Sequence, residues 1–248
     1  MPLVISHRGA NREAPENTMP AFRKALEYNV DGFENDVHLT KDGVAVVCHD
    51  NTVDRTSNGT GTIEEMDFAD LRSLSFDYGM PGFAGVQIPT LAEWFDLVAG
   101  MKLLNVEIKD APNLAPVVKA TIDLAKEKGC FDALVISSFA DEALVQAKAY
   151  DPTCRTALLF SADRADVEAI FDDPAAYAHK LHLDGFHPFC GVANPDFIEA
   201  CHAAGLFVNV WTTNTPTQLR LSGQFGVDAV ITDDPALAME ILYAKQAA

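Results

Sequence analysis

The feature that most constrains the fold is an alternation of two kinds of segment along the whole chain. Short apolar, β-branched runs predict eight strands, at residues 4–6, 32–36, 103–108, 134–137, 156–160, 184–187, 207–211 and 229–232. Amphipathic segments between them predict helices at 19–28, 91–98, 115–128, 142–149, 165–171, 196–204, 217–225 and 236–244. Eight strand–helix units in 248 residues predict an α/β fold, the (β/α)8 TIM-type barrel. The alternative is a doubly wound sheet, which no glycine-rich nucleotide turn supports.

One interval breaks this regular spacing. More than fifty residues separate the second predicted strand from the helix at 91–98, and they include a hairpin-like run at 39–47 and a short helical piece at 64–74. A long segment after the carboxyl end of a barrel strand is typical of elements that cover a substrate. Residues 51–89 have too few apolar side chains for a core of their own. We therefore expect them to form a small insertion or cap within one barrel domain that spans residues 1–248.

The charge of the chain limits its partners. With 18 basic and 36 acidic residues, its formal net charge is −18. Such a surface repels the phosphates of nucleic acids and anionic membranes, so neither is an expected partner. A small anionic substrate would need positive charge gathered locally at its binding site.

The cysteine pattern and the lack of a long apolar stretch indicate the cellular compartment of the protein. The five cysteines are widely spaced and form no CxxC pair, which is typical of reduced thiols. No signal-peptide pattern follows Met1, and no apolar run reaches the roughly 18 residues of a membrane span. We expect a cytoplasmic protein without stable membrane insertion, and an oligomer is compatible with the sequence.

Three carboxylates stand at the ends of predicted strands. Glu34 and Asp36 are two residues apart, so both side chains lie on one face of a strand, and Glu107 and Lys109 share a face in the same way. The carboxyl ends of barrel strands form the active-site face. Three converging carboxylates suit a hard divalent cation, and their mutual repulsion favours one. Oxygen ligands of this kind fit either Mg²⁺ or Ca²⁺.

Basic side chains accompany these acids. His7 ends the first predicted strand and His49 ends the run VAVVCH. Two histidines near carboxylates can serve as the base and the acid of a hydrolysis. Arg8 and Lys109 supply the positive charge that a phosphodiester requires.

The order of several short motifs carries a resemblance. The chain contains HRGANREAPENT at 7–18, the E-x-D of Glu34 and Asp36, LTKDG and HD at His49 and Asp50. It continues with DRTSNGTG, PTLAEW, EIK at 107–109, NVWTTN and GVDAVITDDP. In sequence and order these motifs resemble those of the glycerophosphodiester phosphodiesterases, over most of the chain, with WTTN differing slightly from the more usual WTVN.

The resemblance implies a set of roles. It implies a (β/α)8 barrel with an insertion after the second strand, and a divalent metal on Glu34, Asp36 and Glu107. His7 and His49 would be the catalytic pair. The remaining implied contacts are phosphate binding by Arg8 and Lys109, and a glycerol-side wall of Trp211 with Phe139 and Phe189 as further candidates.

Several residues also have purely structural interpretations. His38 shares the strand parity of Glu34 and Asp36 and could reach the site, but it lies beyond the predicted strand end and we expect it to be a loop histidine. His187 is a weak candidate at a strand end. Thr18 is interpreted as a helix cap, and Glu16 and Asn17 as loop residues with mixed capping and supporting roles. Asp50 either orients the imidazole of His49 or binds the insertion backbone. Asp233 and Asp234 precede Pro235 and are interpreted as caps of the last helix.

The resulting hypothesis is a metal-dependent enzyme that hydrolyses a glycerophosphodiester to sn-glycerol 3-phosphate and an alcohol. The residues do not decide between direct attack by water and a cyclic phosphate intermediate. One alternative is a lysophospholipase D-like enzyme with an apolar rim at 76–86. The other is a barrel that binds glycerophosphodiesters without hydrolysing them.

Overall fold

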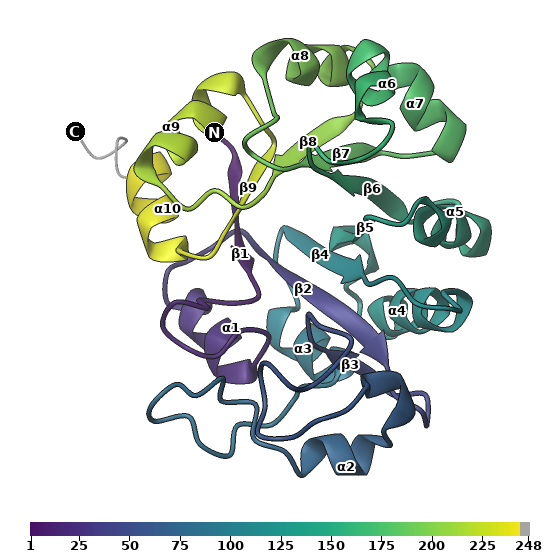
Figure 1. The fold of residues 1–248 in the computed structure, drawn as a ribbon. Coiled ribbons are helices and arrows are strands. Elements are labelled where there is room, and N and C mark those ends of the chain that lie inside the picture. Colours follow the sequence, from purple (N-terminus) through teal and green to yellow (C-terminus); the bar gives the residue numbers. More distant parts are fainter. Residues whose placement is uncertain (244–248) are drawn as a thin grey trace.

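The fold is a closed barrel of parallel strands surrounded by helices, as a computed structural model describes it for residues 1–243 (Figure 1). The barrel strands are β1 (Leu3–His7), β2 (Gly32–Leu39), β4 (Leu103–Ile108), β5 (Leu134–Ser138), β6 (Arg155–Phe160), β7 (Gly185–Pro188), β8 (Phe207–Val210) and β9 (Ala229–Thr232). The ring closes because β1 pairs with both β2 and β9. The predicted (β/α)8 barrel is therefore confirmed, with each predicted strand in its expected position.

Helices cover the outside of this ring, apart from α2 (Phe68–Arg72), which lies in the insertion at residues 51–89. They are α1 (Met19–Leu26), α2 (Phe68–Arg72), α3 (Leu91–Val98), α4 (Ala115–Glu127), α5 (Asp141–Tyr150), α6 (Val167–Asp172), α7 (Pro174–Leu181), α8 (Pro195–Ala203), α9 (Pro216–Phe225) and α10 (Pro235–Tyr243). Two short 3₁₀ helices lie at Ile63–Glu65 and Phe131–Ala133. The predictions omitted α7, although Asp173 caps it and Pro174 begins it. Ala244, predicted in the last helix, lies outside the described residues.

The alternation of side chains along the strands separates two apolar regions. Outward side chains such as Phe33, Val106 and Ile136 pack with the helices in the main core. Inward side chains such as Ile5, Val135 and Ile231 fill the interior of the barrel. The strands are therefore apolar on both faces, as expected for a parallel sheet that is covered on both sides, and the polar side chains near their carboxyl ends are exceptions.

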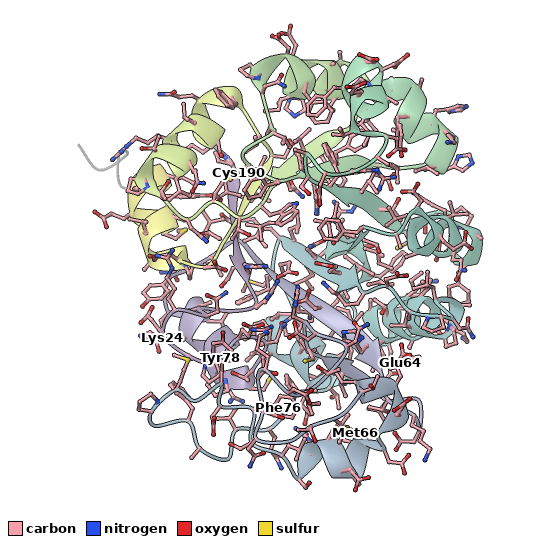
Figure 2. The ribbon with its side chains drawn as sticks, viewed as in Figure 1. Lys24, Glu64, Met66, Phe76, Tyr78 and Cys190 are labelled. Carbon is pink, nitrogen blue, oxygen red and sulfur yellow. The ribbon has the colours of Figure 1, made fainter. Side chains whose placement is uncertain are left out.

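The hairpin predicted at 39–47 is present. Strand β3 (Ala45–Val47) pairs antiparallel with the end of β2, outside the ring. The insertion, residues 51–89, follows this hairpin and contains the first 3₁₀ helix and α2. It packs around a small separate core whose buried members are Val46, Cys48, Val53, Ile63, Leu71, Phe76 and Ile88. Figure 2 labels Phe76 in this segment, together with Met66 and Tyr78.

Two further findings bear on the compartment predictions. The five cysteines are free thiols. None of the helices that the structure describes is long and apolar enough to cross a membrane.

The close approach of β2 to β4 depends on Gly32. A Cβ atom at this position would lie 1.9 Å from the carbonyl oxygen of Leu103. We expect Gly32→Ala to destabilise the protein by about 1–3 kcal/mol or more, because the two strands must separate. The measurement is the midpoint of urea unfolding. Gly223→Ala is the matched control, since its Cβ would meet only the flexible end of Leu242, at 3.3 Å; equal stability of the two variants would contradict the prediction.

Candidate active site

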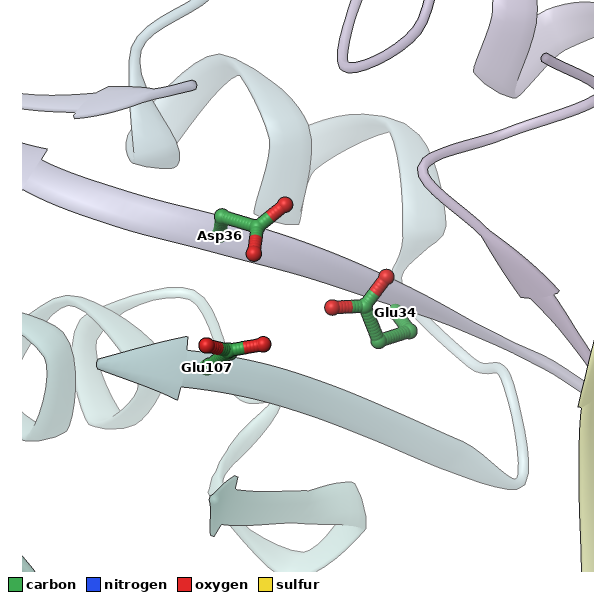
Figure 3. A group of neighbouring side chains, drawn as sticks. All are labelled: Glu34, Asp36 and Glu107. Carbon is green, nitrogen blue, oxygen red and sulfur yellow. The ribbon is translucent and has the colours of Figure 1, made fainter. Parts of the chain in front are cut away.

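The register between two neighbouring strands brings the three acids together. In the parallel pairing of β2 with β4, Asp36 lies opposite Glu107, and Glu34 lies opposite Asn105. Oxygen atoms of Glu34, Asp36 and Glu107 all lie within 4.8 Å of one another, and all three side chains are buried (Figure 3). The cluster is thus built by strand geometry rather than by a flexible loop.

Two cationic side chains offset the charge of Asp36, and a neutral amide donates a hydrogen bond to it. Arg8 places Nε 3.2 Å from Asp36 Oδ2, and Lys109 places Nζ 3.4 Å from Asp36 Oδ1. Lys109 also donates a hydrogen bond of 2.5 Å to Glu107, and Asn17 donates one of 2.8 Å to Asp36. Arg8 and Asn17 both have positive φ, a conformation that is uncommon for side chains of this kind and that tends to occur at functional sites.

The pKa values of the three acids indicate that Arg8 and Lys109 offset only part of the negative charge of the cluster. Burial raises the pKa of Glu107 to about 7, and the charge of Asp36 acts in the same direction. Burial and the charge of Asp36 likewise raise the pKa of Glu34 well above its ordinary value. Burial opposes ionisation of Asp36 too, but Arg8 and Lys109 hold the pKa of Asp36 below its ordinary value.

The donor set fits a divalent cation. Asp36 Oδ1 is buried and accepts no hydrogen bond from the described residues. A hard cation bound by Glu34, Asp36 and Glu107 would satisfy this oxygen and would favour the ionised form of all three carboxylates. The cluster can therefore hold such an ion, and its oxygen ligands suit Mg²⁺ and Ca²⁺ alike.

Each histidine at the site is held by a carboxylate. His7 Nδ1 lies 2.5 Å from Asp233 Oδ1, and Asp233 also accepts hydrogen bonds from Asn11 at 2.7 Å and Asn214 at 2.6 Å. The other ring nitrogen of His7 lies 3.9 Å from Glu34. With Nδ1 bound to Asp233, the nitrogen left for a reacting group is Nε2.

His49 has the same arrangement with its chain neighbour. Its Nδ1 lies 2.6 Å from Asp50 Oδ1, so Asp50 orients the imidazole. Of the two interpretations of Asp50, this is the one that the structure supports. Burial lowers the pKa of His49, and the charges of Arg8 and Lys109 lower it further. The neutral imidazole is thereby favoured.

Both histidines line one cavity of about 240 Å³, together with Arg8, Glu34 and Glu107, whereas Asp36 and Lys109 are not among its lining residues. Its polar lining consists of His7, Arg8, Glu34, His49, Asn105, Glu107 and Thr212, and its apolar lining consists of Phe139, Leu159, Trp211 and Ile231. The ring of Trp211 meets those of Phe139 and Phe189 edge to face, at centroid distances of 5.5 and 5.6 Å. Trp211 also donates a hydrogen bond of 2.7 Å to the backbone of His187. The cavity thus combines charged and aromatic lining residues.

A family model matches residues 7–237, and its description is the Glycerophosphoryl diester phosphodiesterase family. The chain belongs to this family. A glycerophosphodiester phosphodiesterase of Caldanaerobacter subterraneus subsp. tengcongensis is 36% identical, over 97% of both chains. The predicted family and enzyme class are therefore confirmed.

Solved structures of similar proteins agree with this assignment. A putative glycerophosphoryl diester phosphodiesterase from Silicibacter pomeroyi has a TM-score of 0.90 and 26% identity, over 99% of this chain and 94% of that one. An Oleispira antarctica phosphodiesterase in complex with the product sn-glycerol-3-phosphate has a TM-score of 0.87 and 29% identity. That match covers 100% of this chain and 98% of the Oleispira chain.

Three interpretations of individual residues are wrong. Asp233 binds His7 rather than capping the last helix, whereas Asp234 does cap it by accepting from Leu237 N at 3.0 Å. Thr18 occupies the N-cap position of α1, but its hydroxyl donates to the carbonyl of Pro15 and accepts no hydrogen bond from an N–H group of the helix. His38 lies within β2, where it is buried, and not in a loop.

Other candidates lie at the edge of the site or away from it. His187 is buried inside the barrel and accepts a hydrogen bond of 2.9 Å from Asn209. Among the described residues that line the cavity, neither His187 nor Phe189 occurs. Three residues without a predicted role, Asn11, Asn214 and Arg55, support site residues through hydrogen bonds, and each stands within one of the quoted motifs.

The raised pKa of Glu107 predicts how stability depends on pH without a divalent cation. A carboxyl whose pKa rises on folding stabilises the folded state fully below its ordinary value near 4.5, and this contribution is lost as pH rises through about 7. A loss of roughly 2 kcal/mol would lower Tm by about 4–8 °C. Calorimetry in EDTA between pH 5 and 8 measures it. The decrease in Tm between pH 5 and 8 should be smaller in Glu107→Gln, and smaller in the parent protein with saturating Mg²⁺ or Ca²⁺. An equal dependence of Tm on pH in the parent and in Glu107→Gln would contradict the raised pKa of Glu107.

Proposed function

We propose that this protein hydrolyses glycerophosphodiesters, such as glycerophosphocholine or glycerophosphoethanolamine, to sn-glycerol 3-phosphate and an alcohol. The observation that carries the proposal is a single cavity in which His7 and His49, each held by a carboxylate, accompany Glu34, Glu107 and Arg8. The product bound to the similar Oleispira phosphodiesterase supports this substrate class.

Glu34, Asp36 and Glu107 are proposed to bind one divalent cation, Mg²⁺ or Ca²⁺. When bound, such a cation neutralises the negative charge that develops on the phosphoryl oxygens. Arg8 and Lys109 supply further positive charge at the phosphate, which a chain with a net charge of −18 requires locally.

The two histidines are proposed to act as general base and general acid. Asp233 and Asp50 each hold Nδ1–H, so each ring presents Nε2 to the substrate. One ring takes a proton from the attacking hydroxyl group, which belongs to water or to the glycerol itself. The other donates a proton to the leaving alkoxide oxygen. Both directions of transfer are available because each imidazole is anchored through the nitrogen that does not react.

The remaining parts of the molecule are assigned by position. Trp211 and Phe139 are proposed to contact the apolar side of the glycerol, since both are aromatic side chains that line the cavity. The insertion at 51–89 is proposed to be a cap within the barrel domain, because its core includes Val46 and Cys48 from the β3 hairpin region. A cytoplasmic location remains our proposal from the sequence.

Neither alternative is favoured by an observation. For a lysophospholipase D-like enzyme the rim at 76–86 should extend the cavity, yet among the described residues none from this range lines it. Within the same range, Phe76 is buried in the core of the insertion. A barrel that only binds its ligand has no use for two histidines with carboxylate anchors.

Activity on glycerophosphocholine with and without EDTA tests the proposal most directly. We expect release of sn-glycerol 3-phosphate that EDTA abolishes and that Mg²⁺ or Ca²⁺ restores, because three buried carboxylates require a cation to stay ionised together. An enzyme-coupled assay of the product measures it. Undiminished release in EDTA would exclude the metal, and no release under any condition would exclude the reaction.

Substitutions at one histidine and at the carboxylate that anchors the other test the acid–base pair. His49→Ala is expected to lower kcat by about 10²–10⁴, since a proton-transfer group is lost. Asp233→Asn keeps His7 but replaces its carboxylate with an amide that can hold the wrong tautomer, so a fall in kcat of at least the same order is expected. Circular dichroism confirms folding, and His179→Ala is the control because His179 lies on α7, away from the cavity. Full activity of His49→Ala would move the acid–base role to another residue.

A further inference from the structure

Arg55, in the insertion, forms ion pairs with carboxylates from two different segments. Its Nη1 and Nη2 donate to the two oxygens of Glu16, each at 2.8 Å. Its Nε and Nη2 donate to the two oxygens of Asp50, at 2.6 and 3.0 Å. Both contacts are bidentate, and this geometry fixes the direction of each carboxylate as well as its distance.

Each of these carboxylates holds a residue of the site. Asp50 accepts the hydrogen bond from Nδ1 of His49. Glu16 Oε1 accepts a hydrogen bond of 3.1 Å from Nη1 of Arg8, whose Nε lies 3.2 Å from Asp36. Arg55 is therefore separated from His49 by one side chain and from Arg8 by another.

We propose that Arg55 is a positioning residue through which the insertion aligns His49 and Arg8 together. The proposal rests on the proposed function for its effect on catalysis. The Asp50 side chain is 27% exposed, so without Arg55 it can turn toward water and release the imidazole. Glu16 shares Oε1 between two guanidinium groups; without Arg55, both of its oxygens become available to Arg8. Loss of Arg55 thus affects turnover through His49 and substrate binding through Arg8.

The insertion itself holds Arg55 in place. The guanidinium carbon of Arg55 lies 5.4 Å from the ring centroid of Tyr78, which Figure 2 labels in the insertion. The backbone N–H of Tyr78 donates to the carbonyl of Thr56, next to Arg55 in the chain. Stacking on Tyr78 leaves the edge of the guanidinium directed at the two carboxylates.

A second arginine of the insertion provides a comparison. Arg72 donates a hydrogen bond of 2.8 Å to the carbonyl of Ile88 and forms an ion pair with Glu93 on α3. It therefore joins the insertion to the barrel as Arg55 does, but its partners are not site residues. If Arg55 were only an anchor of the insertion, substitution of either arginine would have the same consequence.

Steady-state kinetics on glycerophosphocholine separate the two roles. We expect Arg55→Gln to lower kcat by about tenfold or more and to raise KM. Arg55→Lys is expected to recover only part of the loss, because an ammonium group cannot form both bidentate contacts. Adding Glu16→Gln to Arg55→Gln is expected to restore KM but not kcat, since the neutral side chain no longer draws Arg8 away from the site.

The control is Arg72→Gln, which is expected to stay within about twofold of the parent in both constants. Thermal unfolding of the variants shows whether each insertion remains folded. The proposal is overturned if Arg55→Gln keeps kcat and KM within about twofold of the parent, or if Arg72→Gln loses activity to the same extent.

A measurement without substrate distinguishes failure of this proposal from failure of the proposed function. The Nδ1–H proton of His49 should give a resonance in the nitrogen-edited NMR spectrum of the full chain, assigned by its loss in His49→Ala. We expect it to persist in Arg72→Gln and to disappear by exchange in Arg55→Gln. If the parent does not hydrolyse glycerophosphodiesters but the resonance responds in this way, the proposed function fails and the positioning role stands. An unchanged resonance in Arg55→Gln overturns the positioning role whatever the activity.

Discussion

The repulsion among three buried carboxylates is the constraint on which the rest of the site depends. Glu34, Asp36 and Glu107 converge because β2 and β4 are adjacent and in register, and their charges are poorly solvated there. The neighbouring structure compensates for this charge with Arg8 and Lys109. The unusual backbone conformation of the segment after β1 places Arg8, whereas Lys109 follows β4.

Closure of the barrel has a direct chemical consequence. Because β1 pairs with β9, the end of the first strand lies beside the end of the last. His7 can therefore be anchored by Asp233, a residue 226 positions away in the chain. An open sheet with the same strands would leave His7 without this carboxylate. Barrel closure thus contributes to the chemistry of the site as well as to stability.

The insertion is bonded to side chains that support the site. Its small core continues from the β3 hairpin, which connects it with the strand that carries Glu34 and Asp36. Through Arg55 it reaches both Glu16 and Asp50. The insertion is therefore bonded to the carboxylates that support His49 and Arg8, two residues that line the cavity.

Local patterns were enough to predict most of the fold and the central residues of the site. Strand and helix periodicity placed the barrel strands, and the spacing of two residues placed Glu34 and Asp36 on one face. Helix α7 was missed because it follows α6 after a single residue, so the two were interpreted as one helix and a loop. The local signal of Asp173 and Pro174 would have separated them.

The sequence by itself determined the properties that follow from short-range regularity. These are the positions of the strands, the placement of Glu34 and Asp36 on one strand face, and the order of the motifs. Only the tertiary structure decided which side chains support them. Asp233 looked like a helix cap because its neighbours are Asp234 and Pro235, and its bond to His7 exists only once the ring of strands has closed. Arg55 likewise meets Glu16 only after the insertion has folded back against the segment before α1. Hydrogen bonds between such distant residues depend on orientation in space, and no periodicity along the chain encodes that orientation.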